Sequence, residues 1–251
     1  MADRNVALVT GGSRGIGAAI VRTLAKSGYA VVFSYHQRAD EADALCKALR
    51  DAGSKALALP CDAAQADQIE RLVADTLAAH GRIDVLVNNA GVHVPNVFFA
   101  DLADADWTHV LDVNLTAPYR FARAVVPVMR SQGGGHIVNL SSNVTQRMPA
   151  GYGVYAVSKA GLEAFTRILS KEEGRHGIRV NAVGPGPIRT DMLQQSLDAL
   201  GEARAQAFLQ SITMGRMGEP EEIASVVAFL LSDAASYMTG QIVYVNGGGV
   251  A

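Results

Sequence analysis

The stretch Val6-Ala-Leu-Val-Thr10-Gly11-Gly12-Ser13-Arg14-Gly15-Ile16-Gly17 joins a short apolar run to an amphipathic segment. We expect a strand over Asn5–Thr10 and a helix over Ile16–Ser27, because the apolar residues change from a continuous run to helical spacing. Glycine is needed where the backbone turns tightly and where a Cβ would block a pyrophosphate. The helix N-terminus offers unpaired N–H groups to phosphates. The stretch therefore predicts a dinucleotide-binding turn.

The same alternation continues to the end of the chain. Apolar runs predict strands at Ala30–Ser34, Lys55–Leu59, Ile83–Val87, His136–Leu140, Ile178–Val183 and Gln241–Val245. Amphipathic runs predict helices at Glu41–Ala52, Ala66–His80, Asp104–Met129 with a break near Val113, Tyr155–His176, Leu193–Ile212 as a pair, and Pro220–Leu231. Pro185-Gly186-Pro187 is expected to be irregular. Nearly continuous apolar strands are typical of a parallel sheet covered on both faces.

These elements predict one α/β domain over residues 1–251, a doubly wound parallel sheet (Rossmann fold) of about seven strands flanked by helices. The net charge of −2 gives no electrostatic basis for binding nucleic acid or an anionic membrane. No apolar run approaches the roughly 18 residues of a membrane span, and Met1–Asn5 is unlike a signal peptide, so a cytoplasmic protein is expected. Cys46, Cys61 and the six scattered histidines fit no metal-binding spacing, so no metal site is predicted.

Three polar residues near the middle of the chain predict acid–base chemistry. Tyr155 and Lys159 are four residues apart, on one face of a predicted helix. An ammonium beside a phenol favours the phenolate and lowers a pKa that starts near ~10. Ser142 follows the strand predicted at His136–Leu140, and ligands of doubly wound folds bind at such carboxyl ends. Next to a dinucleotide, this group indicates an oxidoreductase.

The spacing Gly11-x-x-x-Gly15-x-Gly17, the run Asn88-Asn89-Ala90-Gly91 and the pair Tyr155-x-x-x-Lys159 together resemble the short-chain dehydrogenase/reductase family. The resemblance extends from Val6 to about Gly248. It implies that Tyr155 transfers the proton and that Ser142 hydrogen-bonds the substrate oxygen. Lys159 is expected to lower the pKa of Tyr155 and to hold the nicotinamide ribose. Asn114 matches the residue that kinks its helix and orders a proton-relay water.

The residues after the second strand predict the choice of nucleotide. An acidic residue there would hold the ribose 2′-hydroxyl of NAD, but no carboxylate occurs until Asp40, and Arg14 and Arg38 are available for a 2′-phosphate. We therefore predict NADP(H) in preference to NAD(H), although Arg38 has an alternative interpretation as a solvated surface charge.

The family resemblance implies the remaining nucleotide contacts. Asp62 matches the position that holds the adenine, with a helix N-cap as the alternative. Asn88, Ala90 and Gly91 match the residues that line the adenosine ribose side and brace the sheet. Pro185-Gly186 matches the clasp around the carboxamide, with a loop breaker as the alternative. The predicted cofactor-binding residues are Gly11, Ser13, Arg14, Gly15, Ile16, Gly17, Tyr35, His36, Arg38, Asp62, Asn89, Ala90, Gly91, Tyr155, Lys159, Pro185, Gly186, Ile188 and Thr190.

Apolar residues dominate the segments expected to bind substrate, His93–Phe99, Asn143–Tyr152 and Met192–Met214. They are Val94, Val97, Phe98, Met148, Tyr152, Met192, Leu193, Phe208 and Met214. This lining suits a ketone or acyl chain better than a polyol, and we assign substrate contacts to Ser142, Val94, Tyr152 and Met192. Tyr119 is expected in the core.

Within the family, the chain is similar to bacterial 3-oxoacyl-acyl-carrier-protein reductases and related carbonyl reductases. Gly133 and His176 stand where that group commonly has the basic residues that dock the acidic carrier, although Arg130 and Arg175 lie close by. The resemblance also implies a homotetramer, or in some members a dimer, assembled through Asp112–Met129, Tyr155–Arg175 and the last strand.

The predicted function is the reversible, NADPH-dependent reduction of a ketone or 3-oxoacyl substrate to the alcohol. The expected partner is thus a small ketone, alcohol or acyl thioester. One alternative is an NAD-dependent alcohol or sugar dehydrogenase of the same family. An alternative of another class is a non-catalytic dinucleotide-binding sensor.

Overall fold

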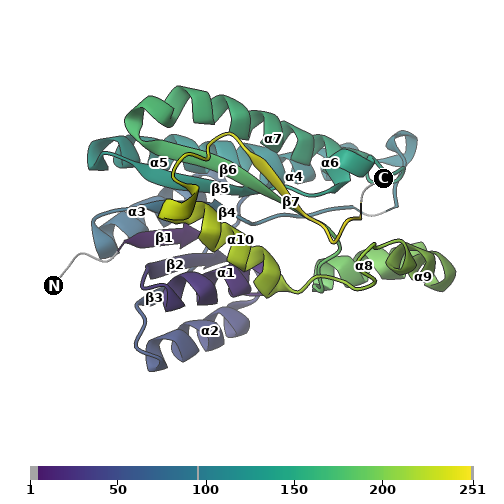
Figure 1. Ribbon diagram of the computed structural model, residues 1–251, viewed down its shortest axis with the longest axis horizontal. Coiled ribbons are helices and arrows are strands. Elements are labelled where there is room, and N and C mark those ends of the chain that lie inside the picture. Colours follow the sequence, from purple (N-terminus) through teal and green to yellow (C-terminus); the bar gives the residue numbers. More distant parts are fainter. Residues whose placement is uncertain (1–4, 95, 250–251) are drawn as a thin grey trace.

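The computed structural model describes residues 5–94 and 96–249, and within them the chain forms a seven-stranded parallel sheet (Figure 1). The sequence of the first residues was expected to differ from a signal peptide. This expectation concerns residues 1–4, which are outside the described residues. The strand order is β3-β2-β1-β4-β5-β6-β7. The strands are β1 (Val6–Val9), β2 (Ala30–Tyr35), β3 (Ala56–Pro60), β4 (Val85–Asn88), β5 (Gly135–Leu140), β6 (Ile178–Pro185) and β7 (Ile242–Val245).

Helices cover both faces of this sheet, so the predicted α/β fold is confirmed. The helices are α1 (Gly15–Lys26), α2 (Ala39–Asp51), α3 (Ala66–His80), α4 (Asp104–Leu111), α5 (Ala117–Gln132), α6 (Val144–Arg147), α7 (Gly153–Glu173), α8 (Asp191–Leu200), α9 (Glu202–Gln210) and α10 (Pro220–Leu231). Figure 1 shows α1, α2 and α10 below the sheet and α5 and α7 above it. This arrangement is a single Rossmann-like domain.

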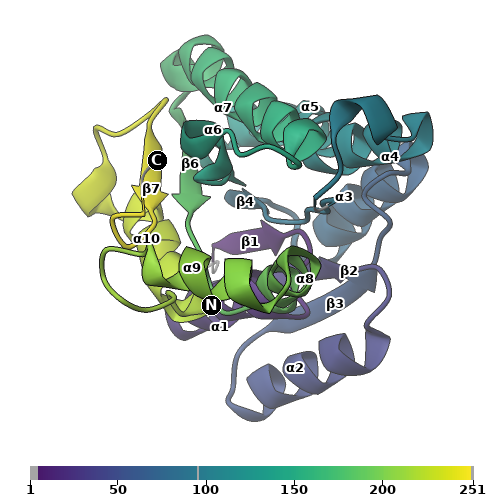
Figure 2. The same cartoon turned by 90° about the vertical axis from the view of Figure 1, so that its right-hand side faces the viewer.

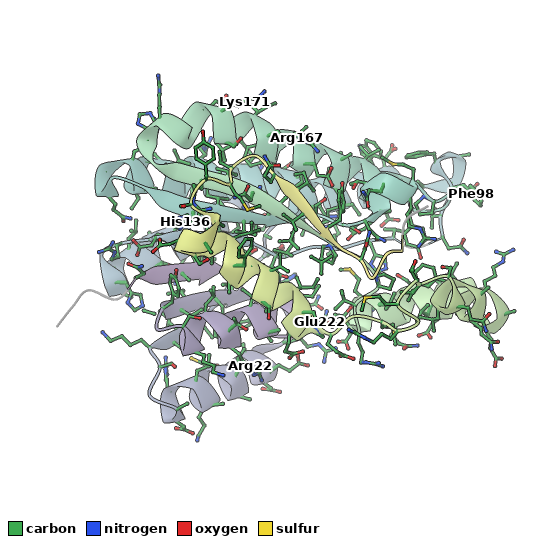
Figure 3. The ribbon with its side chains drawn as sticks, in the orientation of Figure 1. Arg22, Phe98, His136, Arg167, Lys171 and Glu222 are labelled. Carbon is green, nitrogen blue, oxygen red and sulfur yellow. The ribbon has the colours of Figure 1, made fainter. Side chains whose placement is uncertain are left out.

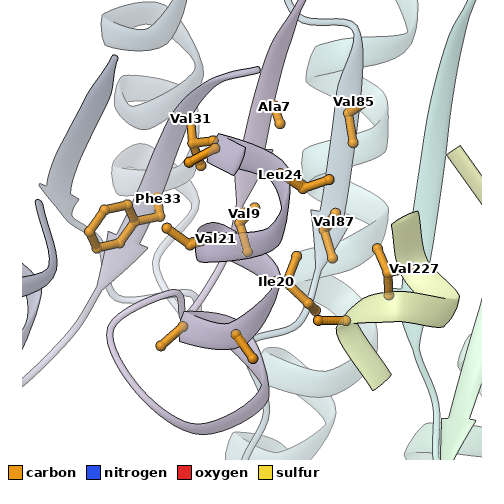
Figure 4. Packing of buried hydrophobic residues seen from close by; sticks show 14 of the residues in the cluster. Ala7, Val9, Ile20, Val21, Leu24, Val31, Phe33, Val85, Val87 and Val227 are labelled. Carbon is orange, nitrogen blue, oxygen red and sulfur yellow. The ribbon is translucent and has the colours of Figure 1, made fainter. Parts of the chain in front are cut away.

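Alternating strand residues build the two halves of the core. Ala7 and Val9 of β1 point toward α1 and pack with Leu24, whereas Leu8 belongs to the cluster on the opposite face with Phe121 of α5. The close-up in Figure 4 shows the first cluster, in which Ile20, Val21 and Leu24 of α1 lie against the strands and near Val227 of α10. Because both faces of the inner strands are buried, these strands have the nearly continuous apolar sequences that predicted them.

Some details differ from the sequence-based expectation. Pro185, expected in an irregular segment, is the last residue of β6 and pairs with Val245. This is possible because a proline at a strand end leaves few ladder hydrogen bonds unmade. The short helix α6 was not predicted, since one turn is too brief to show helical spacing. Tyr119, expected in the core, is 48% exposed on α5.

The predicted break near Val113 is a turn of π-helix over Asp112–Thr116, between α4 and α5. The helices α8 and α9 stand apart from both helical layers. Figure 1 shows them at one end of the molecule, and Figure 2 shows them in front when that end faces the viewer. They connect β6 to α10, so they lie beyond the carboxyl end of the sheet.

Candidate active site

The glycine turn after β1 leaves no room for side chains at its key positions. A Cβ at Gly17 would overlap the Gly11 carbonyl oxygen and lie 2.6 Å from Asn89 Nδ2. Gly11 has φ +64 and faces Ala90 at 3.0 Å, so both its conformation and its surroundings require glycine. The turn ends at the N-terminus of α1, where no side chain caps the helix. Free N–H groups at a helix N-terminus are suited to binding a phosphate, as the glycine spacing predicts for this turn.

Thr10 and Asn89 hold this turn against the end of β4. Asn89 Nδ2 donates to the carbonyl oxygens of Thr10 and Gly11, both at 2.9 Å. Thr10 Oγ1 accepts from the backbone N–H groups of Asn89 and Ala90, both at 3.0 Å. The strand order reverses between β1 and β4, and doubly wound folds bind ligands at that point. Asn88 is buried and donates instead to Asn139 Oδ1, so it braces the sheet rather than lining the cleft.

Both arginines of the predicted 2′-phosphate site are engaged by carboxylates. Arg14 donates to Asp191 at 2.6 Å, and Arg38 donates to Glu41 at 3.0 Å. All four side chains are substantially exposed, so these pairs contribute little to stability and can exchange partners. Asp62 Oδ1 accepts from the Ala64 N–H at 2.9 Å. The N-cap of α3 is Gln65, so the alternative of a helix N-cap for Asp62 is wrong.

The four residues predicted to be catalytic gather around the carboxyl end of β5. Ser142 follows β5, whereas Tyr155 and Lys159 lie one turn apart on α7. Lys159 Nζ donates to the Leu140 carbonyl oxygen at 2.7 Å and lies 5.7 Å from the centre of the Tyr155 ring.

Asn114 belongs to the π turn and is fully buried. Its Nδ2 donates to the Val92 carbonyl oxygen at 2.8 Å and to Ser158 Oγ at 3.0 Å, while its Oδ1 accepts from the Val92 N–H at 2.9 Å. The side chain thus ties the segment after β4 to α7 from behind the cleft. π turns frequently occur at functional sites.

The expected lowering of the Tyr155 pKa by Lys159 is wrong for the protein without nucleotide. Burial raises the pKa of Tyr155, and the hydrogen bond with Ser142 only partly opposes this. Burial also lowers the pKa of Lys159 to about 8. Spacing placed the two groups together correctly, but burial disfavours the charged form of each and sets the direction of both pKa shifts. A phenol that is protonated at neutral pH is equipped to donate a proton.

The segment after β6 lines the part of the cleft where the nicotinamide is predicted to bind. Gly186 N–H donates to the Val245 carbonyl oxygen at 2.9 Å, and a Cβ at Gly186 would lie 2.5 Å from Asn246 Cα. Ile188 is buried, and Thr190 Oγ1 caps α8 by accepting from the Leu193 N–H. Gly186 is thus tied to the end of β7, and it lines the cleft together with Pro185.

A single cleft of about 790 Å³ brings these groups together. All the predicted cofactor-binding residues line it, as do Ser142, Tyr152 and Met192. Its volume is typical of a small-molecule or cofactor site. The glycine cradle and this continuous lining, which runs from the β2 end to Tyr155, fit an extended dinucleotide.

Several residues predicted for the substrate pocket lie elsewhere. Val94 is half-buried but does not line the cleft. Phe98, Met148 and Met214 are 59%, 58% and 62% exposed, and Figure 3 shows Phe98 pointing outward at the end of the molecule. Apolar composition alone does not tell which side of a loop faces the pocket. Leu193 and Phe208 do line the cleft, whereas Val97 does not.

His93 was predicted only as the first residue of a substrate-binding segment, with no contact of its own, and it lines the cleft beside Tyr155. Its ring lies edge-on to Tyr155 with 6.0 Å between centroids, and its Nε2 is 2.9 Å from Ser196 Oγ on α8. Burial lowers the pKa of His93, which favours the neutral ring. No spacing pattern marks the contact with Ser196, because the two residues are 103 positions apart.

Two negative findings concern the described part of the chain. None of its helices combines the length and apolar character that crossing a bilayer requires. Nor does it contain a group of three or more His, Cys, Asp or Glu residues arranged to hold a metal ion.

The geometry agrees with comparisons to known proteins. The family model described as enoyl-(acyl carrier protein) reductase matches residues 11–249. A 3-oxoacyl-[acyl-carrier-protein] reductase from a Synechocystis species is 40% identical over 244 residues, which cover 97% of this chain and 96% of that protein.

Several solved structures of other proteins also resemble this chain in fold and sequence. A short-chain dehydrogenase/reductase from Serratia marcescens superposes with a TM-score of 0.90 at 38% identity, covering 98% of each chain. A blue fluorescent protein from a metagenomic library, in complex with NADPH, gives a TM-score of 0.91 at 36% identity, again covering 98% of each chain. The chain belongs to the short-chain dehydrogenase/reductase family. It is an NAD(P)-dependent oxidoreductase that acts on CH–OH groups and their carbonyl counterparts.

Proposed function

We propose that the protein reduces a ketone or 3-oxoacyl group to the alcohol, reversibly, with NADPH as the hydride donor. The observation that carries this proposal is the position of the Tyr155 phenol. It lines the same cleft as the glycine cradle and has a pKa raised by burial, so it is protonated at neutral pH. A protonated donor suits the reductive direction, in which a carbonyl oxygen gains a proton.

Each side chain has a distinct task in this mechanism. Ser142 donates a hydrogen bond to the substrate carbonyl oxygen and stabilises the negative charge that develops there. Tyr155 transfers its proton to the same oxygen. When bound, the reduced nicotinamide supplies the hydride for the carbonyl carbon. The ammonium of Lys159 stabilises the phenolate left on Tyr155 and holds the ribose hydroxyls. Asn114 keeps the segment after β4 in register with α7, in line with a role in proton relay.

The preference for NADP(H) is supported by the residues after β2. Tyr35, His36 and Arg38 line the cleft there, and no residue from Ser34 to Arg38 carries a carboxylate that could hold the 2′-hydroxyl of NAD. Arg14 and Arg38 supply two guanidiniums for the phosphate once they leave their exposed carboxylate partners. The relative solved with NADPH supports the same choice.

The runner-up is an NAD-dependent alcohol or sugar dehydrogenase. The apolar side chains of Tyr152, Met192, Leu193 and Phe208 in the cleft favour a ketone or acyl chain over a sugar.

The contacts of Arg130 and Arg175 give no support to docking of a carrier protein, whereas exposed apolar side chains support assembly into an oligomer. Arg130 is held by Glu173 through two hydrogen bonds of 2.6 and 2.8 Å, and Arg175 donates to its neighbour His176, so neither arginine favours docking of an acyl carrier protein. We also infer a homotetramer, which would cover the exposed apolar side chains of α5 and α7. These are Tyr119, Val157 and Ile168.

The proposal is tested by following NADPH absorbance with neutral ketones, 3-oxoacyl thioesters and sugars, and the reverse reaction with alcohols. Steady NADPH consumption with ketones or thioesters is the expected result. Turnover only with NAD and alcohols or sugars would favour the runner-up. Nucleotide binding without turnover of any substrate would favour a dinucleotide-binding sensor.

A further inference from the structure

Three arginines line the cleft, and two of them form ion pairs with carboxylates. Arg14 and Arg38 each pair with a carboxylate at the nucleotide end. Arg147 lies on α6, at the end formed by α6, α8 and α9, and it is only half-buried. Among the described residues, no carboxylate pairs with Arg147 and no acceptor receives a hydrogen bond from its guanidinium. A cation in such a cleft favours an anionic ligand.

The position of Arg147 is fixed relative to the reacting groups. It is the last residue of α6, which begins two residues after Ser142. Thr145 Oγ1 donates to the Ser142 carbonyl oxygen at 2.9 Å, and the Arg147 N–H donates to the Asn143 carbonyl oxygen at 3.2 Å. A helix rises about 1.5 Å per residue, so the Arg147 backbone lies within roughly 8 Å of Ser142. One small substrate can therefore touch both residues.

Phe208 orients the guanidinium without using its hydrogen bonds. The Arg147 Cζ atom lies 5.1 Å from the centre of the Phe208 ring, which α9 brings to the cleft. Stacking on an aromatic ring occupies a face of the guanidinium and leaves its N–H donors free in the plane. Those donors match the two oxygens of a carboxylate or phosphate.

The acidic residues of the cleft do not compete for Arg147. Asp191 is bound to Arg14, and Asp62 accepts from a backbone N–H beyond β3. Pro149, Tyr152 and Leu200, which come from the segments around α6 and α8, also line the cleft and are uncharged. An anion that enters this end meets one positive charge in an environment that is drier than the bulk solvent, where a charge-assisted bond is strong.

We propose that Arg147 binds an anionic group of the substrate, so that the substrate class is oxo compounds that carry a carboxylate or a phosphate. The inference rests on the proposed reductase function and assigns its specificity. The carboxylate of a free oxo acid and the phosphate on the arm of an oxoacyl thioester share this chemistry.

Paired substrates separate the contribution of the anion from that of the carbonyl. Initial rates with saturating NADPH are measured for oxo acids against their methyl esters, and for 3-oxoacyl-phosphopantetheine against 3-oxoacyl-pantetheine. The proteins are the wild type, Arg147→Met, Arg147→Lys and Arg204→Met. Arg204 is a matched control, because it is an exposed arginine of α9 that does not line the cleft.

We expect Arg147→Met to lower kcat/KM for one or both anionic substrates by at least about tenfold, the usual effect of losing a charge-assisted hydrogen bond. The neutral partner of each pair should change less than about twofold. Arg147→Lys should restore part of the loss, and Arg204→Met should behave as the wild type. The pair that responds identifies the source of the anion.

An equal loss on charged and neutral partners would overturn the inference, and so would no loss on either pair. Unchanged turnover of the neutral ketone also serves as the control for folding. Failure of the proposed function is distinguishable, because the wild type would then oxidise NADPH with no member of any pair.

Discussion

The Nζ atom of Lys159 lies 5.7 Å from the centre of the Tyr155 ring, and both groups have pKa values shifted against their charged forms. Lys159 is held there by its hydrogen bond to the Leu140 carbonyl oxygen at the end of β5. The ammonium thus faces the phenol from a fixed point of the sheet. We therefore expect the rate of the reductive reaction to depend on whether Lys159 is protonated.

The reductive rate should fall at alkaline pH. Lys159, with a pKa lowered to about 8, is charged below that pH and neutral above it, while the phenol with its raised pKa stays protonated. We therefore expect kcat/KM for ketone reduction to be level below about pH 8 and to decrease tenfold per pH unit well above it. Profiles of NADPH oxidation measure this.

The control for that profile is Lys159→Arg. An arginine stays charged across the range, so the decline near pH 8 should disappear even if the absolute rate is lower. A reductive kcat/KM that rises through pH 8 in the wild type would contradict the assignment.

Arg38 should determine the preference for the 2′-phosphate. Arg38→Asp replaces a guanidinium by a repelling carboxylate, so the Kd of NADPH should increase by at least about tenfold, while that of NADH changes little. The matched control is Glu41→Gln, which removes the present partner of Arg38 and should leave NADPH binding equal or tighter. Fluorescence titration with both nucleotides is the measurement. Equal weakening of both nucleotides by Arg38→Asp would refute the role.

The glycine turn should tolerate no side chain at Gly17. In Gly17→Ala the new Cβ overlaps the Gly11 carbonyl oxygen, so the turn must open and NADPH binding should be lost, together with several degrees of Tm. Gly174→Ala is the control, since nothing lies within 4 Å of a Cβ there and φ is −55. That variant should keep its affinity and gain about 0.4–1 kcal/mol of stability at most. Thermal unfolding and NADPH titration compare the two, and normal NADPH affinity in Gly17→Ala would count against a phosphate cradle at the turn.

The fold was predictable because its inner strands are buried on both faces. Ile178–Val183 was predicted as a strand and β6 extends it by two residues, and Pro220–Leu231 was predicted as a helix with the bounds of α10. In α10, Pro220 at the first position and the capping box between Glu219 and Glu222 mark the start chemically. Glu222 also pairs with Arg216, and it is visible near the start of α10 in Figure 3.

The site was predictable only where short motifs carry it. The residues of the glycine turn and of the Tyr155–Lys159 pair line one cleft, as their motifs indicated. Contacts between distant segments, such as His93 with Ser196 and Arg147 with Phe208, have no spacing pattern. The error about the Tyr155 pKa has a physical origin too, because sequence spacing gives proximity but does not give the cost of desolvation.

The central claim is that the Tyr155 hydroxyl donates the proton during NADPH-dependent reduction. Tyr155→Phe removes that hydroxyl and keeps the ring, so single-turnover oxidation of bound NADPH by a ketone tests the claim directly. We predict that the rate falls by at least about 10³-fold while the Kd of NADPH changes less than about threefold. Oxidation of NADPH by Tyr155→Phe within about tenfold of the wild-type rate would contradict the account.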